Sequence, residues 1–177
     1  MADEALAAFD RELQILSKVT ETFATTLPSL VPSGDVNVHT LRNQIFAHTL
    51  VRMAFIHLNI KFAANDISAN VRCVEAAIVI VKLFDDIDLA RLEVLPPTMA
   101  NAWLTAGQVF IQEIVRLTTI GSQPSDVLPI TTRKEEVTNL LDRLELMMAT
   151  VGAKAPIFSL QHVVLRKSRD EQIIIRD

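Results

Sequence analysis

Histidine is the residue type whose spacing first suggests chemistry, because three of the four histidines lie in one apolar stretch. His39, His48 and His57 follow one another at intervals of nine residues. In a helix each residue turns by about 100°, so His48 would point away from the other two, and His39 and His57 would lie about 27 Å apart along the axis. Two histidines that ligate one metal from a helix lie four residues apart, as in H-E-x-x-H. We therefore expect these histidines in the core, in an interface or at polar edges, and not at a shared metal.

Three aspartates lie close together in the sequence and form an acidic cluster, namely Asp85, Asp86 and Asp88. Clustered aspartates in a helical protein resemble the Mg²⁺ site of terpene synthases, whose motif places a carboxylate four residues after its first aspartate. That position is Leu89 here, and no second metal-binding motif follows. Carboxylates at the C-terminal end of a helix oppose the helix dipole. The cluster therefore indicates a helix that ends in solvent.

Cys73 is the single cysteine, so a disulfide within the chain and a thiolate zinc cluster are both excluded. A single unpaired cysteine fits a reducing compartment. Arg72 would lower the pKa of the thiol, but Val71 and Val74 on either side predict a buried thiol that packs as a small apolar group. The glycines are isolated, so no phosphate-binding loop is present, and no nucleophile elbow occurs. We predict no catalytic, cofactor-binding or metal-binding residues, and no enzymatic activity.

Two further groups of side chains are candidates for lining a binding surface. The first shares one predicted helix and comprises Trp103, Gln108, Gln112 and Glu113. The second comprises Met147 and Met148. Aromatic and methionine side chains at helical spacing more often fill a core, and the core interpretation is the one we favour for both groups.

The apolar residues recur every three or four positions along most of the chain, which is the period of an amphipathic helix. In the first such stretch they are Leu6, Phe9, Leu13, Leu16, Val19 and Phe23. The predicted helices cover residues 3–25, 38–64, 68–85, 96–119, 131–151 and 157–167. Helix 38–64 is apolar on more than one side, so we expect it at the centre. Gly107 falls inside a predicted helix, where close packing of a second helix would explain it. The sequence predicts a single all-α domain over residues 1–177, a bundle of five to six helices whose tail is frayed from about residue 168.

Composition limits the partners of such a domain. The 177 residues are 50% apolar, and the formal net charge is −4, so a nucleic acid would find no overall attraction. The densest basic group, Arg166, Lys167 and Arg169, is followed at once by two acidic residues and is typical of a solvated helix end. The N-terminus lacks the apolar segment of a secretory signal, and the most apolar run, residues 76–81, is too short to span a bilayer. We expect neither nucleic-acid binding nor membrane insertion. The mean hydropathy of +0.30 then indicates a large core or a buried interface.

The order of several short segments along the chain gives a more specific indication. The segments are Phe23-Ala-Thr-Thr-Leu-Pro-Ser-Leu30, His39-Thr-Leu41, Thr49 to Leu58, Cys73-Val-Glu-Ala-Ala77, Leu95-Pro-Pro97, Trp103 to Leu117, and Met147-Met148 through Ala155-Pro156 to Leu160. In order and spacing they resemble the C-terminal half of the fungal-specific transcription factor domain, the helical regulatory region of zinc-cluster regulators. The resemblance covers residues 13–167. Each segment alone is ordinary helix packing, and their order and spacing together carry the resemblance.

The resemblance implies a regulatory or interaction role in the nucleus. It implies self-association or a protein partner on an apolar helical face, and it leaves room for a small-molecule effector. The DNA-binding Zn₂Cys₆ module needs six cysteines, so DNA binding does not carry over to a chain with Cys73 alone. The chain begins where the family's helical domain would already be half built, so we expect uncovered apolar surface. Two alternatives remain open: a bundle, located in the cytoplasm, that binds a small molecule or acts as an enzyme, and a plain oligomerisation module.

Overall fold

Six α-helices make up the computed structural model, which describes residues 2–28, 38–85, 87–89, 92, 95–120 and 127–173. The helices are α1 (Ala2–Thr26), α2 (Val38–Ala63), α3 (Ile67–Lys82), α4 (Pro97–Ile120), α5 (Val127–Gly152) and α6 (Pro156–Ile173). No strand occurs in the described ranges. The predicted all-α bundle of five to six helices is confirmed.

The N-terminal ends of α3 and α5 follow from local chemistry. The Oδ1 atom of Asp66 accepts a hydrogen bond of 2.8 Å from the backbone N–H of Ser68, so Asp66 is the N-cap of α3. The predicted start of α5 is wrong, because the helix begins at Val127 and not at Thr131. Pro129 therefore falls in the first turn, where a backbone N–H would have no partner within the helix, so the proline costs no hydrogen bond.

The predicted C-terminal ends of α3 and α6 also need correction. α3 ends at Lys82, so Asp85 lies in the turn that follows. α6 continues to Ile173, and the prediction of a frayed tail from residue 168 is wrong for residues 168–173. An ion-pair network on α5 holds this part of α6, because Nη1 of Arg169 lies 2.7 Å from Asp142 and 3.0 Å from Glu145.

The centre of the bundle is α4, whereas the sequence suggested α2. α4 packs against α2, α3, α5 and α6 and contributes twelve buried residues, whereas α2 contributes five. Small residues of α4 let its neighbours approach closely. A Cβ atom added to Gly107 would lie 2.5 Å from Cδ1 of Leu165 on α6, so the predicted close helix packing at this glycine is confirmed.

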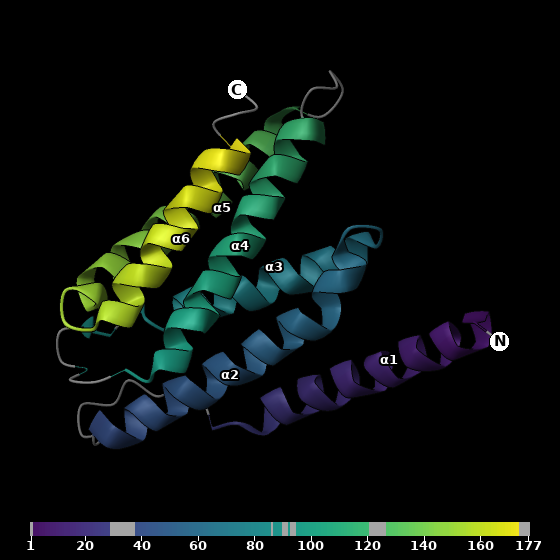
Figure 1. Ribbon diagram of the computed structural model, residues 1–177, viewed down its shortest axis with the longest axis horizontal. Coiled ribbons are helices and arrows are strands. Elements are labelled where there is room, and N and C mark those ends of the chain that lie inside the picture. The colour runs from purple at the N-terminus through teal and green to yellow at the C-terminus, as the bar shows by residue number, and fades with distance from the viewer. Residues whose placement is uncertain are drawn as a thin grey trace.

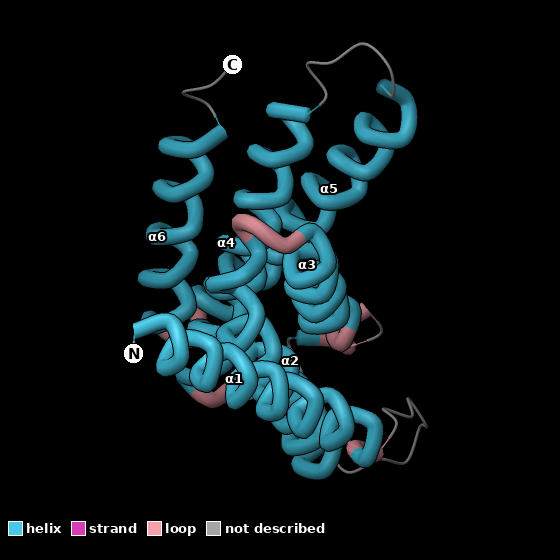
Figure 2. The backbone as a smooth tube through the Cα atoms, turned by 90° about the vertical axis from the view of Figure 1, so that its right-hand side faces the viewer, coloured by secondary structure: helices cyan, strands magenta, loops and turns pink. Residues whose placement is uncertain are grey.

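α1 lies at the edge of the molecule. It runs along the outer side of α2 and, among the six helices, packs against α2 alone (Figure 1). The view turned by 90° shows α4, α5 and α6 on the other side of the molecule from α1 (Figure 2). In the part of the chain that the structure describes, no helix is both long and apolar enough to cross a membrane.

Candidate functional site

The outer face of α1 carries an unusual concentration of exposed apolar side chains. Five of them have between 48% and 61% of their surface exposed and are called the apolar stripe below: Phe9, Ile15, Leu16, Val19 and Phe23. Four of these residues belong to the periodic apolar set that predicted the helix. The periodicity was therefore a correct sign of the helix, but this face does not contribute to the core of the chain itself.

The inner face of α1, which contacts α2, is more polar than the outer one. The half-buried residues of this face recur every three or four positions and comprise Asp10, Leu13, Ser17, Thr20 and Ala24. Leu13 is the one large apolar side chain among them, and no side chain described on α1 is fully buried. α1 is thus docked on its neighbour through limited apolar contact.

A chain of polar contacts links α1 to α2 and α3 at this interface. Asn59 of α2 is only 4% exposed, and its Nδ2 donates to the hydroxyl of Ser17 at 3.1 Å and to the carbonyl of Phe55 at 2.8 Å. The Oδ1 atom of Asn59 accepts a hydrogen bond of 3.3 Å from Nε of Arg72 on α3. Nη2 of Arg72 in turn lies 3.9 Å from Oδ2 of Asp66. Every polar atom of the Asn59 side chain is therefore paired.

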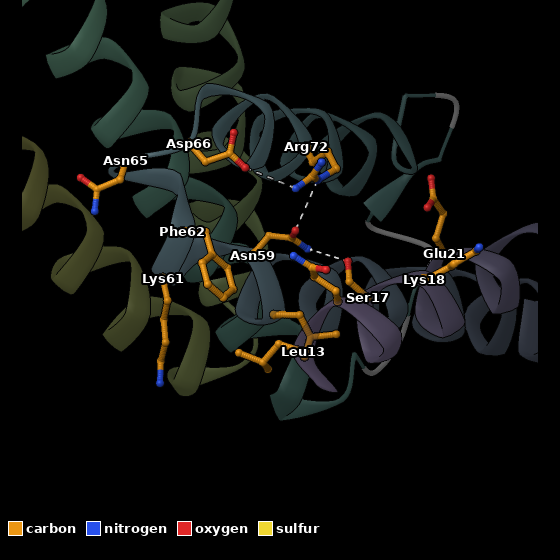
Figure 3. A pocket seen from close by; sticks show the side chains of 12 residues that line it. Leu13, Ser17, Lys18, Glu21, Asn59, Lys61, Phe62, Asn65, Asp66 and Arg72 are labelled. Carbon is orange, nitrogen blue, oxygen red and sulfur yellow. Dashed lines mark hydrogen bonds and ion pairs between the residues drawn. The ribbon is translucent and has the colours of Figure 1, made fainter. Parts of the chain in front are cut away.

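These polar residues border an open cleft of about 600 Å³ where α1, α2 and the beginning of α3 meet (Figure 3). Apolar side chains from α1 and α2 line one part of it, namely Leu13, Leu58 and Phe62. Charged side chains line another part, namely Lys18, Glu21, Lys61, Asp66 and Arg72. The volume of this cleft lies within the range of sites that take small organic ligands.

A second polar cluster lies buried between α3 and α4. Glu113 is 4% exposed; its Oε2 accepts hydrogen bonds from Nδ2 of Asn70 at 2.8 Å and Nε of Arg116 at 2.7 Å, and its Oε1 accepts one from Nη2 of Arg116 at 2.8 Å. Burial alone would raise the pKa of Glu113. The hydrogen bonds from Arg116 and Asn70, with the charges of Arg116 and Arg133, outweigh burial and hold the pKa below its ordinary value. The carboxylate stays ionised and joins two helices.

The group proposed around Trp103 does not converge on one pocket. Trp103 is fully buried and stacks edge-to-face with Phe84 and Phe158, at ring-centroid distances of 5.1 and 5.2 Å. Glu113 lies about 15 Å further along the helix axis. Two members of the group, Gln108 and Gln112, are exposed on the opposite side of α4. The aromatic residue therefore belongs to the core.

The methionine pair and the cysteine are core residues as well. Met147 and Met148 are buried, so they do not form a surface. Cys73 is fully buried, and burial raises the pKa of its thiol to about 11, although the neighbouring charge of Arg72 acts in the opposite direction. Because a thiol of this pKa is protonated near neutral pH, Cys73 has none of the thiolate character that nucleophilic or redox chemistry needs.

The three histidines of α2 lie apart, as their spacing predicts. Nε2 of His48 is 2.8 Å from the carbonyl oxygen of Pro28 and donates to it, which ties the end of α1 to α2. His39 and His57 are exposed. No group of three or more potential metal ligands occurs within the described residues.

The acidic cluster and the basic group each form ion pairs between helices. Asp85 pairs with Arg143 of α5, and Asp88 lies in the connection to α4. Asp86 lies outside the described residues. Among the basic residues of α6, Arg169 binds two carboxylates of α5 and Lys167 lies 3.7 Å from Glu171. Asp85 and Arg169 therefore link segments of the bundle, whereas Lys167 pairs with a carboxylate on its own helix.

Comparisons with protein-family models, with curated proteins and with solved structures find no match to this chain. The resemblance to the fungal transcription factor domain therefore stays a prediction. Among the residues that the structure describes, the candidate functional features are the apolar stripe and the cleft, which lie on the outer and inner sides of the same helix.

The sequence did not point to the cleft. Ser17 and Asn59 are 42 residues apart, and neither belongs to a motif. The one available signal was Asn59 itself, an amide in a strongly apolar stretch, because a buried amide needs partners. In the sequence Arg72 stands out only as a neighbour of Cys73.

Proposed function

We propose that this chain is a protein-interaction domain that self-associates through the apolar stripe of α1. The observation that carries the proposal is the exposure of five large apolar side chains along one face of one helix. Monomeric proteins rarely expose a contiguous apolar patch unless it is a binding site. The proposed role is binding and not catalysis.

The arrangement of the stripe favours a second copy of the chain as the occupant. Phe9 and Phe23 each lie seven residues from Leu16, and seven residues is the repeat by which paired helices interlock. Two antiparallel copies of α1 centred on Leu16 would place Phe9 of each copy against Phe23 of the other. A two-fold interface needs this reciprocity, in which the same two residues meet twice.

The extent of the stripe predicts a weak dimer. A single helix pair lies at the lower end of the size range of specific interfaces, so we expect a dissociation constant on the order of 10 µM. Such a value suits an association that responds to local concentration, as when several copies gather on one target.

The proposed biological role is transcription regulation, and it rests on the resemblance to the fungal zinc-cluster regulators. On this proposal the chain acts in the nucleus through protein contacts or by sensing a small effector. Direct nucleic-acid binding is not proposed, because the formal net charge is −4 and two of the basic residues of α6, Lys167 and Arg169, pair with acidic ones.

Sedimentation equilibrium between about 1 and 100 µM tests the self-association, a range chosen around the expected constant. We expect the wild-type chain to pass from monomer to dimer, and the Leu16→Ser, Val19→Ser double variant to stay monomeric with an unchanged circular dichroism spectrum. A matched control removes exposed apolar side chains from α6 by the substitutions Leu160→Ser and Val163→Ser, and it should dimerise like wild type. A dimer that persists in the α1 variant, or that is lost in the α6 variant, would contradict the proposed interface.

A reporter assay tests the regulatory role separately. The chain would be fused to a monomeric DNA-binding module and supplied with an operator that carries two half-sites. We expect higher occupancy of paired than of single half-sites, and we expect this preference to disappear with the Leu16→Ser, Val19→Ser variant. If the wild-type fusion and the variant fusion occupied paired half-sites equally, the result would argue against regulation through self-association.

A further inference from the structure

The cleft between α1, α2 and α3 combines apolar lining residues with a positively charged side chain, Arg72, that neighbouring residues hold in place. We propose that it binds a small organic carboxylate with an apolar body. Arg72 would take the carboxylate, while Leu13, Leu58 and Phe62 would contact the body. This binding does not depend on self-association, because the cleft lies on the inner side of α1 and the apolar stripe on the outer side.

The guanidinium of Arg72 is positioned before any ligand arrives. Its Nε donates to Oδ1 of the buried Asn59 at 3.3 Å. Its Nη2 lies 3.9 Å from Oδ2 of Asp66, a distance that permits charge attraction but exceeds a hydrogen bond. Asp66 is also engaged elsewhere, since its Oδ1 caps α3 by accepting from Ser68. The terminal N–H groups of the guanidinium thus keep their capacity for a carboxylate, which matches their planar fork.

Charge around the cleft supports an anionic ligand of low charge. Three cations line it, namely Lys18, Lys61 and Arg72, against the two carboxylates of Glu21 and Asp66. The local balance is positive although the whole chain carries −4. The two carboxylates limit this excess to a single positive charge, which one carboxylate group on a ligand balances.

The apolar wall determines the shape of the rest of the ligand. Leu13, Leu58 and Phe62 are half-buried, so each still presents apolar surface to the cleft. Contact with them would remove this surface from water, which adds to affinity in proportion to the area covered. Figure 3 shows Phe62 of α2 and Leu13 of α1 close to the buried amide of Asn59, with Arg72 above it. The volume of about 600 Å³ leaves room for a single ring with a short acidic side chain.

Titration of the ¹⁵N-labelled chain with 4-phenylbutyrate, followed by amide chemical shifts, tests the proposal. The neutral isostere 4-phenylbutan-1-ol and inorganic phosphate are the comparison probes. We expect 4-phenylbutyrate to shift amides around Ser17, Asn59 and Phe62, and to bind at least tenfold more tightly than the other two. Equal binding of the alcohol, equal binding of phosphate, or no shift around the cleft would each overturn the proposal.

Three substitutions localise the binding. Arg72→Gln should weaken 4-phenylbutyrate about tenfold, because a charge-assisted hydrogen bond is lost. Asp66→Asn should strengthen it a few-fold, because a competing charge is removed while asparagine still caps α3. Arg166→Gln, on the exposed side of α6, is the matched control and should change nothing. An Asp66→Asn variant that binds no more tightly, with its amide spectrum intact, would contradict the assignment of Arg72 as the anion receptor.

The same titration repeated in the Leu16→Ser, Val19→Ser variant keeps the two proposals distinguishable. We expect unchanged affinity for 4-phenylbutyrate in this variant whether or not the wild-type chain dimerises. Loss of ligand binding together with self-association would mean that the cleft forms only in an assembly, and it would overturn the proposal of an independent site.

Discussion

The contact of α6 with α4 and the contact of α1 with α2 are both helix pairs, but they are built on opposite principles. α6 buries Phe158 and Leu165 completely, and Leu165 occupies the space that Gly107 leaves open. α1 buries no described side chain fully and presents its apolar stripe to solvent. The contact between α4 and α6 buries apolar side chains of both helices. The contact between α1 and α2 leaves the apolar stripe of α1 exposed to solvent.

The comparison shows that an apolar period in a helix and the burial of its apolar face within the same chain are separate properties. Periodicity shows that a helix forms and which side of it is apolar. It does not show whether that side meets the same chain or another surface. Because stability follows the area removed from water, we expect it to reside in α2 to α6, with α1 as a region of low local stability.

The largest effect should come from the aromatic cluster in the core. Trp103→Ala removes a fully buried indole from between Phe84 and Phe158, and we expect a loss of about 3–5 kcal/mol in the free energy of unfolding. Phe9→Ala on the apolar stripe should change it by no more than about 0.5 kcal/mol. Urea denaturation at a protein concentration below the dimerisation range measures both. Comparable losses would show that α1 shares the core and would remove the contrast between the two regions.

The buried carboxylate should give a smaller, pH-dependent effect. The folded pKa of Glu113 lies below its ordinary value of 4.5, so its stabilisation is fully present above pH 4.5 and is lost as pH falls through the folded pKa. Glu113→Gln should therefore cost about 1–3 kcal/mol at pH 7, and the difference from wild type should narrow below pH 4.5.

The control for this substitution is Glu136→Gln. It breaks a pair of 2.6 Å with Arg133, but both side chains are substantially exposed. We expect at most about 0.5 kcal/mol at any pH, because exposed ion pairs contribute little. If both variants lost the same stability, the burial of Glu113 would have no energetic consequence.

Gly107→Ala tests the closeness of α4 and α6. The new methyl group would collide with Leu165, which costs about 1–3 kcal/mol, and the better helix propensity of alanine offsets about 1 kcal/mol of this. We expect a net loss of about 1 kcal/mol by thermal or urea denaturation. In a Leu165→Ala background the space is available, so the same change should become stabilising. If Gly107→Ala still lowered the free energy of unfolding in the Leu165→Ala background, the steric explanation would be contradicted.

The existence of the helices was predictable because their apolar period extends over many residues. The ends of α5 and α6 were not, since Pro129 reads as a loop residue and Arg169 finds its partners 24 and 27 positions away. The central position of α4 depends on which helices gather around Gly107, and a one-dimensional pattern does not contain that information. The resemblance to the fungal transcription factor domain also rests on short segments of sequence, and it stays untested.

The candidate site was less predictable than the fold. Residues whose types suggest chemistry, such as Cys73 and His57, proved to be a buried thiol and an exposed side chain. The cleft arises where Ser17, Asn59 and Arg72 meet from three helices, and each is an ordinary residue in its own segment. A site formed by docking of helices becomes visible only when their contact faces are known.

The smallest expected effect concerns the docking of α1 and requires a local measurement. Ser17→Ala removes the hydroxyl that accepts from Asn59, which should cost about 0.5 kcal/mol of docking free energy. Alanine also favours the helix itself by a similar amount, so global stability should hardly change. Native-state hydrogen exchange separates the two effects, because amides of α1 should exchange faster while those of α4 keep their protection.

Thr22→Ala is the control, since the Thr22 hydroxyl bonds only to the carbonyl of Lys18 within α1 and not to α2. Should the amides of α1 exchange as slowly as those of α4 in the wild-type chain, α1 would belong to the same cooperative unit as the core. Its apolar stripe would then be the exposed side of a firmly docked helix, and a partner would bind it without any change in how α1 is held.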